Sequence, residues 1–372
     1  MTVKISILLI FYNDAKYLTT AIKSILNQTF DNFELIMLDN GSNDGSSTIA
    51  KQHAQQDSRI KIIKSQQNYH NGSLNFRKLL AHSKGKYIKF FCADDIMTPN
   101  CLNTQIELLE NNNQYLGCFS HMECINDNGK LLKQSHNATI KNNRFEYLNH
   151  LFYSYHAFTF PTAMVKKSAI TNDMLDPRLI HFSDIKLWIK LLMKGEIFVI
   201  KDKLVQYRIR DNQGNVSNIA ENDKKLKSYL FELHLLYDEF FQINNFELYT
   251  KIFPESQKYL NKLNQQTDQD ILPFITAILL YNSEKFKPFH FSLHRNIALL
   301  TIFRIIKDEN LMSKITKKLD FDYLSLYKLT SNFCEALNID YSRKKRNLIH
   351  KLWYKFVARK KYKKLAKENK II

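Results

Sequence analysis

The stretch "KISILLIFYNDAKYLTTAIKSILNQTFDNFELIMLD", residues 4–39, holds three structural patterns in succession. Residues 4–11 and 33–39 are nearly continuous apolar runs, which are typical of strands buried on both faces. Between them, apolar residues recur at helical spacing: Tyr17, Leu18, Ala21, Ile22, Ile25 and Leu26. A strand, a helix and a second strand at this spacing predict two parallel strands joined by a right-handed crossover.

The same alternation continues along the first half of the chain. The elements that we expect next are a strand at 59–64, a helix around 72–82, a strand at 86–93, a hairpin at Asn128-Gly129, a helix near 143–152, a strand near 162–166 and an amphipathic helix at 183–195. Beyond about residue 220, helical patterns dominate. The sequence therefore predicts an α/β fold with a wound, mostly parallel sheet and flanking helices, followed by a helical C-terminal region.

The chain carries a formal net charge of +18, and most of this excess lies in its last thirty residues. Residues 343–372 contain 13 Lys and Arg against one acid, which is a net charge of +12. The five cysteines show no paired metal-binding spacing, which favours reduced thiols in a cytosolic protein. No run reaches the eighteen or so apolar residues of a membrane span, and the first apolar run is too short for a signal peptide.

Polar and aromatic side chains stand at the ends of three predicted strands. Phe11-Tyr12-Asn13 follow the first, Asp39 ends the second, and Asp94-Asp95 follow the strand at 86–93. Because ligands of wound parallel sheets bind at the carboxyl ends of the strands, we expect these residues to converge in one crevice. Adjacent aspartates can hold Mg²⁺ or Mn²⁺ and leave positions open for phosphate oxygens, although the pair could simply cap the following helix.

Three further features suit a nucleotide-sugar site, and each also has a purely structural interpretation. Asp39 and Asp44 surround a tight turn that could grip a base or a ribose. Tyr12 offers a ring for stacking on a base, or a core aromatic. Asp184 begins a predicted helix, where it is either a base for catalysis or an N-cap.

Taken together, residues 4–217 resemble the family 2 glycosyltransferases, inverting enzymes with the GT-A fold. The opening block "ISILLIFYNDAKYLTTAIKSILNQTFDNFELIMLDNGSNDGS" and the block "SKGKYIKFFCADDIMTPNCL" are similar to the family's nucleotide and metal blocks. "SDIKLWIKLL" and "LVQYRIRDNQGNVS" are similar to its acceptor-side block and closing loop. The resemblance implies a metal-dependent inverting transfer from a nucleotide sugar, most simply a UDP-sugar, to a hydroxyl of a glycan or glycolipid in bacterial lipopolysaccharide or surface polysaccharide synthesis.

The resemblance also implies roles for individual residues. Asp184 would be the catalytic base, and Asp95, with Asp94, would hold Mn²⁺ or Mg²⁺. Tyr12 would stack on the base and Asp39 would hydrogen-bond to it. The full set that we expect to bind the nucleotide sugar is Phe11, Tyr12, Asn13, Asp39, Asn40, Arg77, Asp94 and Arg210.

The chain departs from the family pattern at four places. Ile10-Phe11 stand where Pro-Thr is usual, Asn40 stands where the family often has a second aspartate, and Ser183 replaces a glutamate before the base. Arg210 stands where many members carry a histidine that can ligate the metal. An arginine cannot ligate a metal, but it can pair directly with a diphosphate.

The sequence leaves two alternative functions. A nucleotidyltransferase would be expected to show a glycine-rich phosphate loop, and "FYNDAKYL" has no glycine. A non-catalytic protein that binds nucleic acid through the basic tail is the second. An apolar stripe in the tail (Ile349, Leu352, Trp353 and Phe356) fits a helix on an anionic bilayer better, so no nucleic acid is expected. A solvated or partner-binding tail is the simpler alternative.

The expected organisation is a glycosyltransferase domain at 1–220, a helical region at 221–342 and a basic amphipathic tail at 343–372. Within the first domain, the nucleotide-sugar half covers about 1–115 and the acceptor half about 116–220. We expect a cytoplasmic protein that is peripheral on the cytoplasmic face of the inner membrane through its tail.

Overall fold

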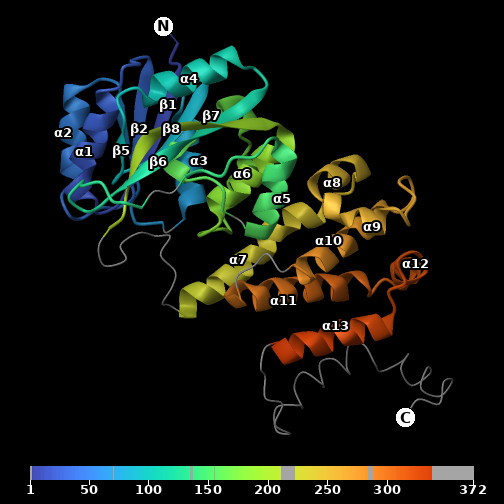
Figure 1. Cartoon of the computed structure of the whole chain (residues 1–372). Coiled ribbons are helices and arrows are strands. Elements are labelled where there is room, and N and C mark those ends of the chain that lie inside the picture. The colour runs from blue at the N-terminus through green and yellow to red at the C-terminus, as the bar shows by residue number, and fades with distance from the viewer. Residues whose placement is uncertain are drawn as a thin grey trace, which may run out of the picture.

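An eight-stranded sheet with the order β3-β2-β1-β4-β7-β6-β8-β5 forms the centre of the first half of the protein. The computed structural model describes residues 2–69, 71–134, 137–154, 156–210, 223–283 and 288–336. The strands are β1 (Ile5–Phe11), β2 (Phe33–Asp39), β3 (Ile60–Lys64), β4 (Tyr87–Cys92), β5 (Ile96–Met97), β6 (Tyr115–Ile125), β7 (Met164–Lys166) and β8 (Glu196–Arg208). Figure 1 shows helices on both faces of this sheet.

The first four strands are parallel, as the sequence predicts. In the register of β1 with β2, Phe11 lies opposite Asp39, and in the register of β1 with β4, Ile10 lies opposite Cys92. The carboxyl ends of these strands therefore meet at one edge, and the residues that follow them face the same space.

Alternation of side chains along the strands explains why both faces of the sheet are buried. Ile5, Ile7 and Leu9 of β1 pack with helices on one face, whereas Leu8 belongs to the core on the other face. The helices of this part are α1 (Ala15–Leu26), α2 (Ser46–Gln56), α3 (Gly72–His82), α4 (Cys101–Asn111), α5 (Arg144–Ser154) and α6 (Ser183–Lys194). Buried side chains of α1, α2 and α4 share a core with Ile5, and those of α3, α5 and α6 share a core with Leu8.

The structure has a short hairpin at the predicted Asn128-Gly129 turn. Gly129 has a φ of 80°, and Ile125 and Leu131 form an antiparallel bridge. The Asn126 N–H donates to the Lys130 carbonyl and the Leu132 N–H donates to the Cys124 carbonyl, which confirms the predicted hairpin over these residues. The long strand β8 was not predicted at all. It runs parallel to β6 and antiparallel to β5, so it brings residues from beyond position 200 to the edge where Asp94 and Asp95 lie.

The C-terminal region is helical over its described residues, as predicted. Its helices are α7 (Asp223–Phe241), α8 (Phe246–Ile252), α9 (Gln257–Leu260), α10 (Leu272–Tyr281), α11 (Pro288–Ile305), α12 (Glu309–Leu319) and α13 (Tyr323–Ala336). Short 3₁₀ helices among the described residues are η1 (Phe160–Thr162), η2 (Lys167–Ala169), η3 (Asn172–Met174), η5 (Pro254–Ser256) and η6 (Gln269–Ile271).

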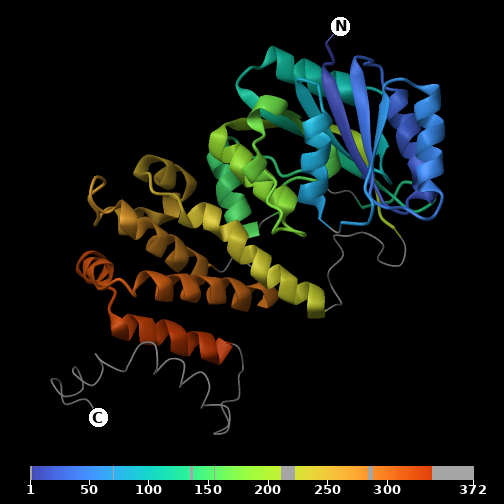
Figure 2. The same ribbon diagram turned by 180° about the vertical axis from the view of Figure 1, so that it is seen from behind.

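The helical region is joined to the sheet domain by a shared core. One apolar cluster runs from the face of the sheet that carries Leu8, through α5 and α6, into α7 and the helices beyond it. Both views show α7 at the junction between the two parts (Figures 1 and 2). None of the described helices is long and apolar enough to cross a membrane. The predicted boundary near residue 220 and the basic tail at 343–372 lie outside the described residues.

Candidate active site

Asp95 follows β4 at the carboxyl edge of the sheet and is fully buried. Its side chain is 0 % exposed, and its Oδ1 accepts a hydrogen bond from the backbone N–H of Arg208 at 2.8 Å. Its Oδ2 is buried without a nitrogen or oxygen partner among the described residues. Burial and the neighbouring charge of Asp94 together raise the pKa of Asp95 well above its usual range. Such a carboxylate is stabilised in its ionised form by a cation placed against the free oxygen.

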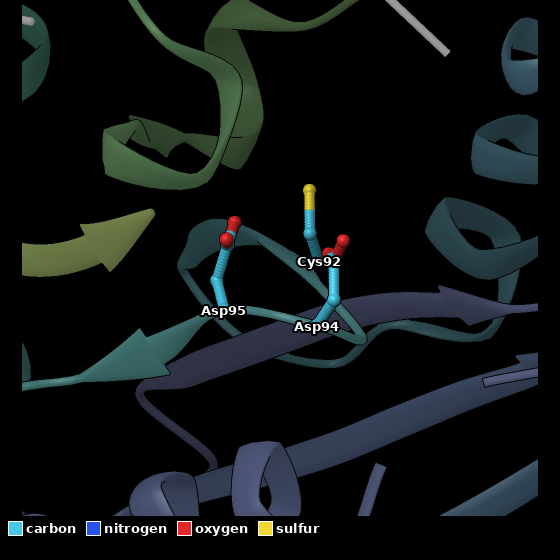
Figure 3. A group of neighbouring side chains, drawn as sticks. All are labelled: Cys92, Asp94 and Asp95. Carbon is cyan, nitrogen blue, oxygen red and sulfur yellow. The ribbon is translucent and has the colours of Figure 1, made fainter. Parts of the chain in front are cut away.

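A cation-binding cluster is available at this point. The candidate ligand atoms of Cys92, Asp94 and Asp95 all lie within 4.8 Å of one another. Figure 3 shows the side chains of Cys92, Asp94 and Asp95 extending toward the same side of the chain, with Cys92 and Asp94 next to each other in this view and Asp95 apart from them. Burial raises the pKa of the Cys92 thiol, which makes it a weak donor rather than a thiolate ligand. The two carboxylates therefore fit a hard divalent cation, and the fit rests mainly on the free oxygen of Asp95.

Arg210 occupies the other side of Asp94. Its Nε lies 2.6 Å from Asp94 Oδ2, and its Nη2 lies 2.5 Å from Asp14 Oδ1. Asp14 is the N-cap residue of α1, but its side chain makes no capping hydrogen bond. Instead it accepts from the Tyr12 backbone N–H at 3.1 Å and from Arg210, and burial raises its pKa. The guanidinium thus links β8 to the ends of β1 and β4.

Arg208 is a second basic residue of the site, and the sequence analysis missed it. It is 3 % exposed, and its Nε donates to the backbone carbonyl of Asp94 at 2.8 Å. The guanidiniums of Arg208 and Arg210 lie 4.9 and 5.0 Å from the centre of the Tyr17 ring. The alternating pattern "YRIR" at the end of a strand is the signal that could have identified Arg208, because side chains two apart share one face.

The ends of β1 and β2 form the expected nucleotide side of the crevice. Tyr12 is 40 % exposed, so its ring is accessible to a ligand. Asp39 is 1 % exposed; its Oδ1 accepts from the Ser42 N–H at 2.9 Å, and its Oδ2 is buried without a partner among the described residues. Asn13 adopts a φ of 55° and its Oδ1 accepts from the Asn43 N–H at 2.9 Å. These contacts fix the loops around an exposed ring and a free carboxylate oxygen.

Other expected ligand residues have structural partners. Phe11 is 1 % exposed and packs in the sheet core, so its ring does not reach the crevice, and the expectation for its side chain was wrong. The Asn40 amide exchanges hydrogen bonds with Asn68 and the Tyr69 backbone. Arg77 Nη2 donates to the Asn172 carbonyl at 2.6 Å, which ties α3 to η3.

The turn after β2 is held by Asp44, as its structural interpretation predicts. Asp44 Oδ1 accepts from the Ser46 N–H, which opens α2, and Oδ2 accepts from the Ala15 N–H, which opens α1. Both oxygens of this carboxylate are therefore used by the backbone of two helix starts.

Asp184 lies in the first turn of α6, directly after Ser183. Its Oδ1 accepts from the backbone N–H of Ile185 at 2.8 Å, and burial raises the pKa of Asp184 to about 6. A Cβ on Gly72, the first residue of α3, would stand 3.8 Å from the Ser183 hydroxyl. Because the loop before α3 bonds to Asn40, which follows β2, the start of α6 lies near the loops that follow this strand end.

Comparisons with known proteins identify the family. Residues 6–172 match the model of glycosyl transferase family 2. An uncharacterized glycosyltransferase of Methanocaldococcus jannaschii, MJ1057, is 33% identical over 228 residues, which cover 60% of this chain and 77% of that protein. The chain belongs to the family 2 glycosyltransferases.

Two further glycosyltransferases match over smaller shares of their length. The putative glycosyltransferase EpsE of Bacillus subtilis is 40% identical over 114 residues, which cover 30% of this chain and 40% of that protein. An uncharacterized glycosyltransferase of Rickettsia bellii is 26% identical, and the match spans only 30% of its length.

Among solved structures, S. aureus TarS 1-349 in complex with UDP-GlcNAc aligns with a TM-score of 0.56 at 16% identity, over 90% of this chain and 91% of that chain. The alignment extends beyond the sheet domain into the helical region. Our protein therefore has the GT-A fold that the resemblance implied, followed by a helical region.

Proposed function

We propose that this protein is a metal-dependent, inverting glycosyltransferase that transfers a sugar from a UDP-sugar to a hydroxyl of a glycan or glycolipid. The observations that carry the proposal are the local environments of two carboxylates, Asp95 and Asp184. Asp95 keeps a buried oxygen free for a cation, and Asp184 has a pKa suited to accepting a proton near neutral pH.

The donor side fits a uridine diphosphate. The exposed Tyr12 ring offers a stacking surface, and the free Asp39 Oδ2 offers an acceptor for a base N–H. The chemistry of the Asp94-Asp95 pair suits Mn²⁺ or Mg²⁺, which when bound would neutralise charge on the diphosphate. Arg210 adds a fixed positive charge at the same place, because its guanidinium already sits against Asp94. TarS, which shares the fold, is described in complex with UDP-GlcNAc, and this supports a UDP-sugar donor.

The acceptor side fits a single displacement. The acceptor oxygen attacks the anomeric carbon while the bond from that carbon to the phosphate oxygen breaks, and the electron pair leaves with the nucleoside diphosphate. Asp184 takes the proton of the acceptor hydroxyl. A carboxylate whose pKa is raised to about 6 is a stronger base than an ordinary aspartate and is still ionised at neutral pH. One base and no enzyme nucleophile give inversion.

Hydrolysis of a panel of nucleotide sugars tests this function without knowledge of the acceptor. We expect slow release of UDP from one UDP-sugar, with UDP-GlcNAc the first to test, and we expect EDTA to abolish it. Asp95→Asn, which removes the charge of the proposed metal ligand, should reduce the release of UDP as EDTA does. Release of nucleotide from none of the sugars, or undiminished release in EDTA, contradicts the proposed donor or the proposed metal.

The proposed acceptor is a growing glycan or glycolipid of lipopolysaccharide or surface polysaccharide synthesis, at the cytoplasmic face of the inner membrane. The support is the sequence of residues 343–372, with its net charge of +12 and its apolar stripe. Each basic residue near an anionic surface contributes about 1 kcal/mol, and salt screens this within about 10 Å. Sedimentation with anionic vesicles at low and high salt, with and without residues 343–372, tests it. A full-length protein that stays in the supernatant at low salt contradicts it.

A further inference from the structure

The loop that precedes the proposed base is held by a glutamate of the C-terminal helical region. Oε2 of Glu232, on α7, accepts hydrogen bonds from three consecutive backbone N–H groups, those of Ile180, His181 and Phe182, at 3.0, 2.7 and 3.1 Å. Glu232 is 2 % exposed. A carboxylate buried this deeply is stabilised by such N–H donors, and charge-assisted bonds of this kind are stronger than neutral ones.

The three donors lie immediately before the first turn of α6. Phe182 is the N-cap residue of α6, and its carbonyl accepts the first hydrogen bond inside the helix, from Lys186. Asp184 is the second residue of that helix. The direction in which α6 begins therefore depends on where residues 180–182 are held, and that direction aims the Asp184 carboxylate.

A second set of contacts fixes the same helix further along. Glu239, two turns after Glu232 on α7, lies 3.1 Å from Nζ of Lys186 and 3.3 Å from Nζ of Lys190. Lys186 is 4 % exposed and also pairs with Asp176 at 2.9 Å. Because Glu232 and Glu239 are seven residues apart, they share one face of α7, and that face is turned toward α6.

We propose that Glu232 is a positioning residue that aims Asp184, so that the C-terminal helical region completes the catalytic site instead of only adjoining it. This inference rests on the proposed role of Asp184 as the base. Residues of α7 would then contribute to catalysis indirectly, through the loop that precedes α6.

The test compares Glu232→Ala and Glu232→Gln with Asp238→Asn, a carboxylate variant on a different face of α7. Three measurements are made on the full chain: hydrogen exchange of the peptide containing residues 180–182, the Asp184 pKa by carboxyl ¹³C NMR, and UDP release from UDP-GlcNAc and the other UDP-sugars of the panel. Asp184→Asn identifies the NMR signal. The Gln variant keeps the size of the side chain and decides the question if the Ala variant does not fold.

For Glu232→Ala we expect faster exchange at residues 180–182 and a fall of the Asp184 pKa from about 6 toward the ordinary range, because a displaced carboxyl gains water. We expect UDP release to fall about tenfold to a hundredfold, which is the size that a misplacement of about 1 Å produces, with binding of the UDP-sugar unchanged. Glu232→Gln should change the exchange rate, the Asp184 pKa and the rate of UDP release in the same directions, but by smaller amounts. Asp238→Asn should match the unmodified protein.

The result that overturns the inference is an unchanged Asp184 pKa together with faster exchange, because the loop would then move without moving the base. Failure of the proposed function gives a different result. In that case Asp184→Asn keeps the full rate of UDP release, or no UDP-sugar is hydrolysed, while the pKa and exchange measurements still decide whether Glu232 positions Asp184.

Discussion

The two carboxylates at the proposed reaction centre are held in place by different means. Asp95 follows a parallel strand, and the backbone of the neighbouring strand β8 donates to it directly. Asp184 lies on a helix whose start is fixed by side chains of α7, about fifty residues away in sequence. The donor side of the site is thus positioned by the sheet, and the acceptor side by packing against the helical region.

The positions of the strand-end residues follow from the pairing of the sheet, whereas the position of α6 depends on side-chain contacts that can differ from one sequence to another. Strand ends in a parallel sheet lie in register, so the spacing of Asp39 and Asp94 follows from the pairing of β1 with β2 and with β4. The position of α6 depends on ion pairs such as that of Lys186 with Glu239, which other sequences can replace. We infer that changes in the helical region alter catalysis at Asp184 without altering donor binding.

The two largest effects are expected from Asp95→Asn and Asp184→Asn. In Asp95→Asn, the amide keeps the bond from the Arg208 N–H but removes the charge that would hold a cation. We expect the rate of transfer to fall on the order of 10³-fold, as when an electrostatic contact to developing charge is lost. The melting temperature should stay equal or rise, because a buried carboxylate beside Asp94 is unfavourable in the absence of a cation.

A matched control is Asp57→Asn, which removes a carboxylate paired with Arg59 at the amino end of the strands. This variant should keep full activity. Retention of activity by Asp95→Asn in the presence of EDTA would show that the donor side works without a metal.

Asp184→Asn should reduce the rate on the order of 10²–10⁴-fold while leaving donor binding intact, since the amide cannot accept a proton. In the unmodified protein the rate should fall as pH drops through about 6, because the carboxylate gains a proton there, and it should level off above pH 7. Initial rates at several pH values and calorimetric binding of the UDP-sugar check both points. A parallel loss of binding would mark Asp184 as structural.

The same contrast explains how far the sequence could predict the molecule. The strand pattern of residues 33–39 predicted β2 with both its ends, and the strand pattern at 86–93 predicted that Asp94 and Asp95 follow a strand. The contacts of Glu232 with the loop at residues 180–182 could not be predicted. A glutamate in an amphipathic helix is usually exposed to solvent, and the sequence does not show which residues lie against it. The expectation for the Phe11 side chain failed for a related reason. Side chains of a strand point alternately to its two faces, and Phe11 lies on the same face of β1 as Ile7 and Leu9, which is buried in the core.

Tyr12→Ala should affect the donor side alone. The ring is exposed at the end of β1, and stacking of an aromatic side chain on a base contributes about 1–3 kcal/mol. We expect the dissociation constant for UDP to rise about fivefold to a hundredfold, with the pH dependence of the rate unchanged. Tyr12→Phe keeps the ring and should bind UDP normally. If Tyr12→Ala binds UDP as well as the unmodified protein does, the base lies elsewhere.

The smallest effect is expected from Arg210→Met, and its sign is informative. Arg210 pairs with Asp94 at 2.6 Å, so a divalent cation that uses Asp94 must compete with the guanidinium. Removing one competing ion pair of about 1 kcal/mol should strengthen binding of Mn²⁺ to the nucleotide-free protein by about fivefold. The same variant should bind the UDP-sugar more weakly, because a positive charge beside the diphosphate is lost.

Calorimetric titration of Mn²⁺ in the absence and presence of UDP measures both effects, and Arg59→Met, which removes an arginine paired with Asp57 at the far end of the strands, is the control. Weaker binding of Mn²⁺ to Arg210→Met would mean that the guanidinium holds Asp94 in the orientation that the metal needs. Arg210 would then help to hold the metal site in place through Asp94, as the backbone of β8 does through Asp95. Stronger binding would mean that the diphosphate draws Arg210 away from Asp94, and that metal and donor enter the site together.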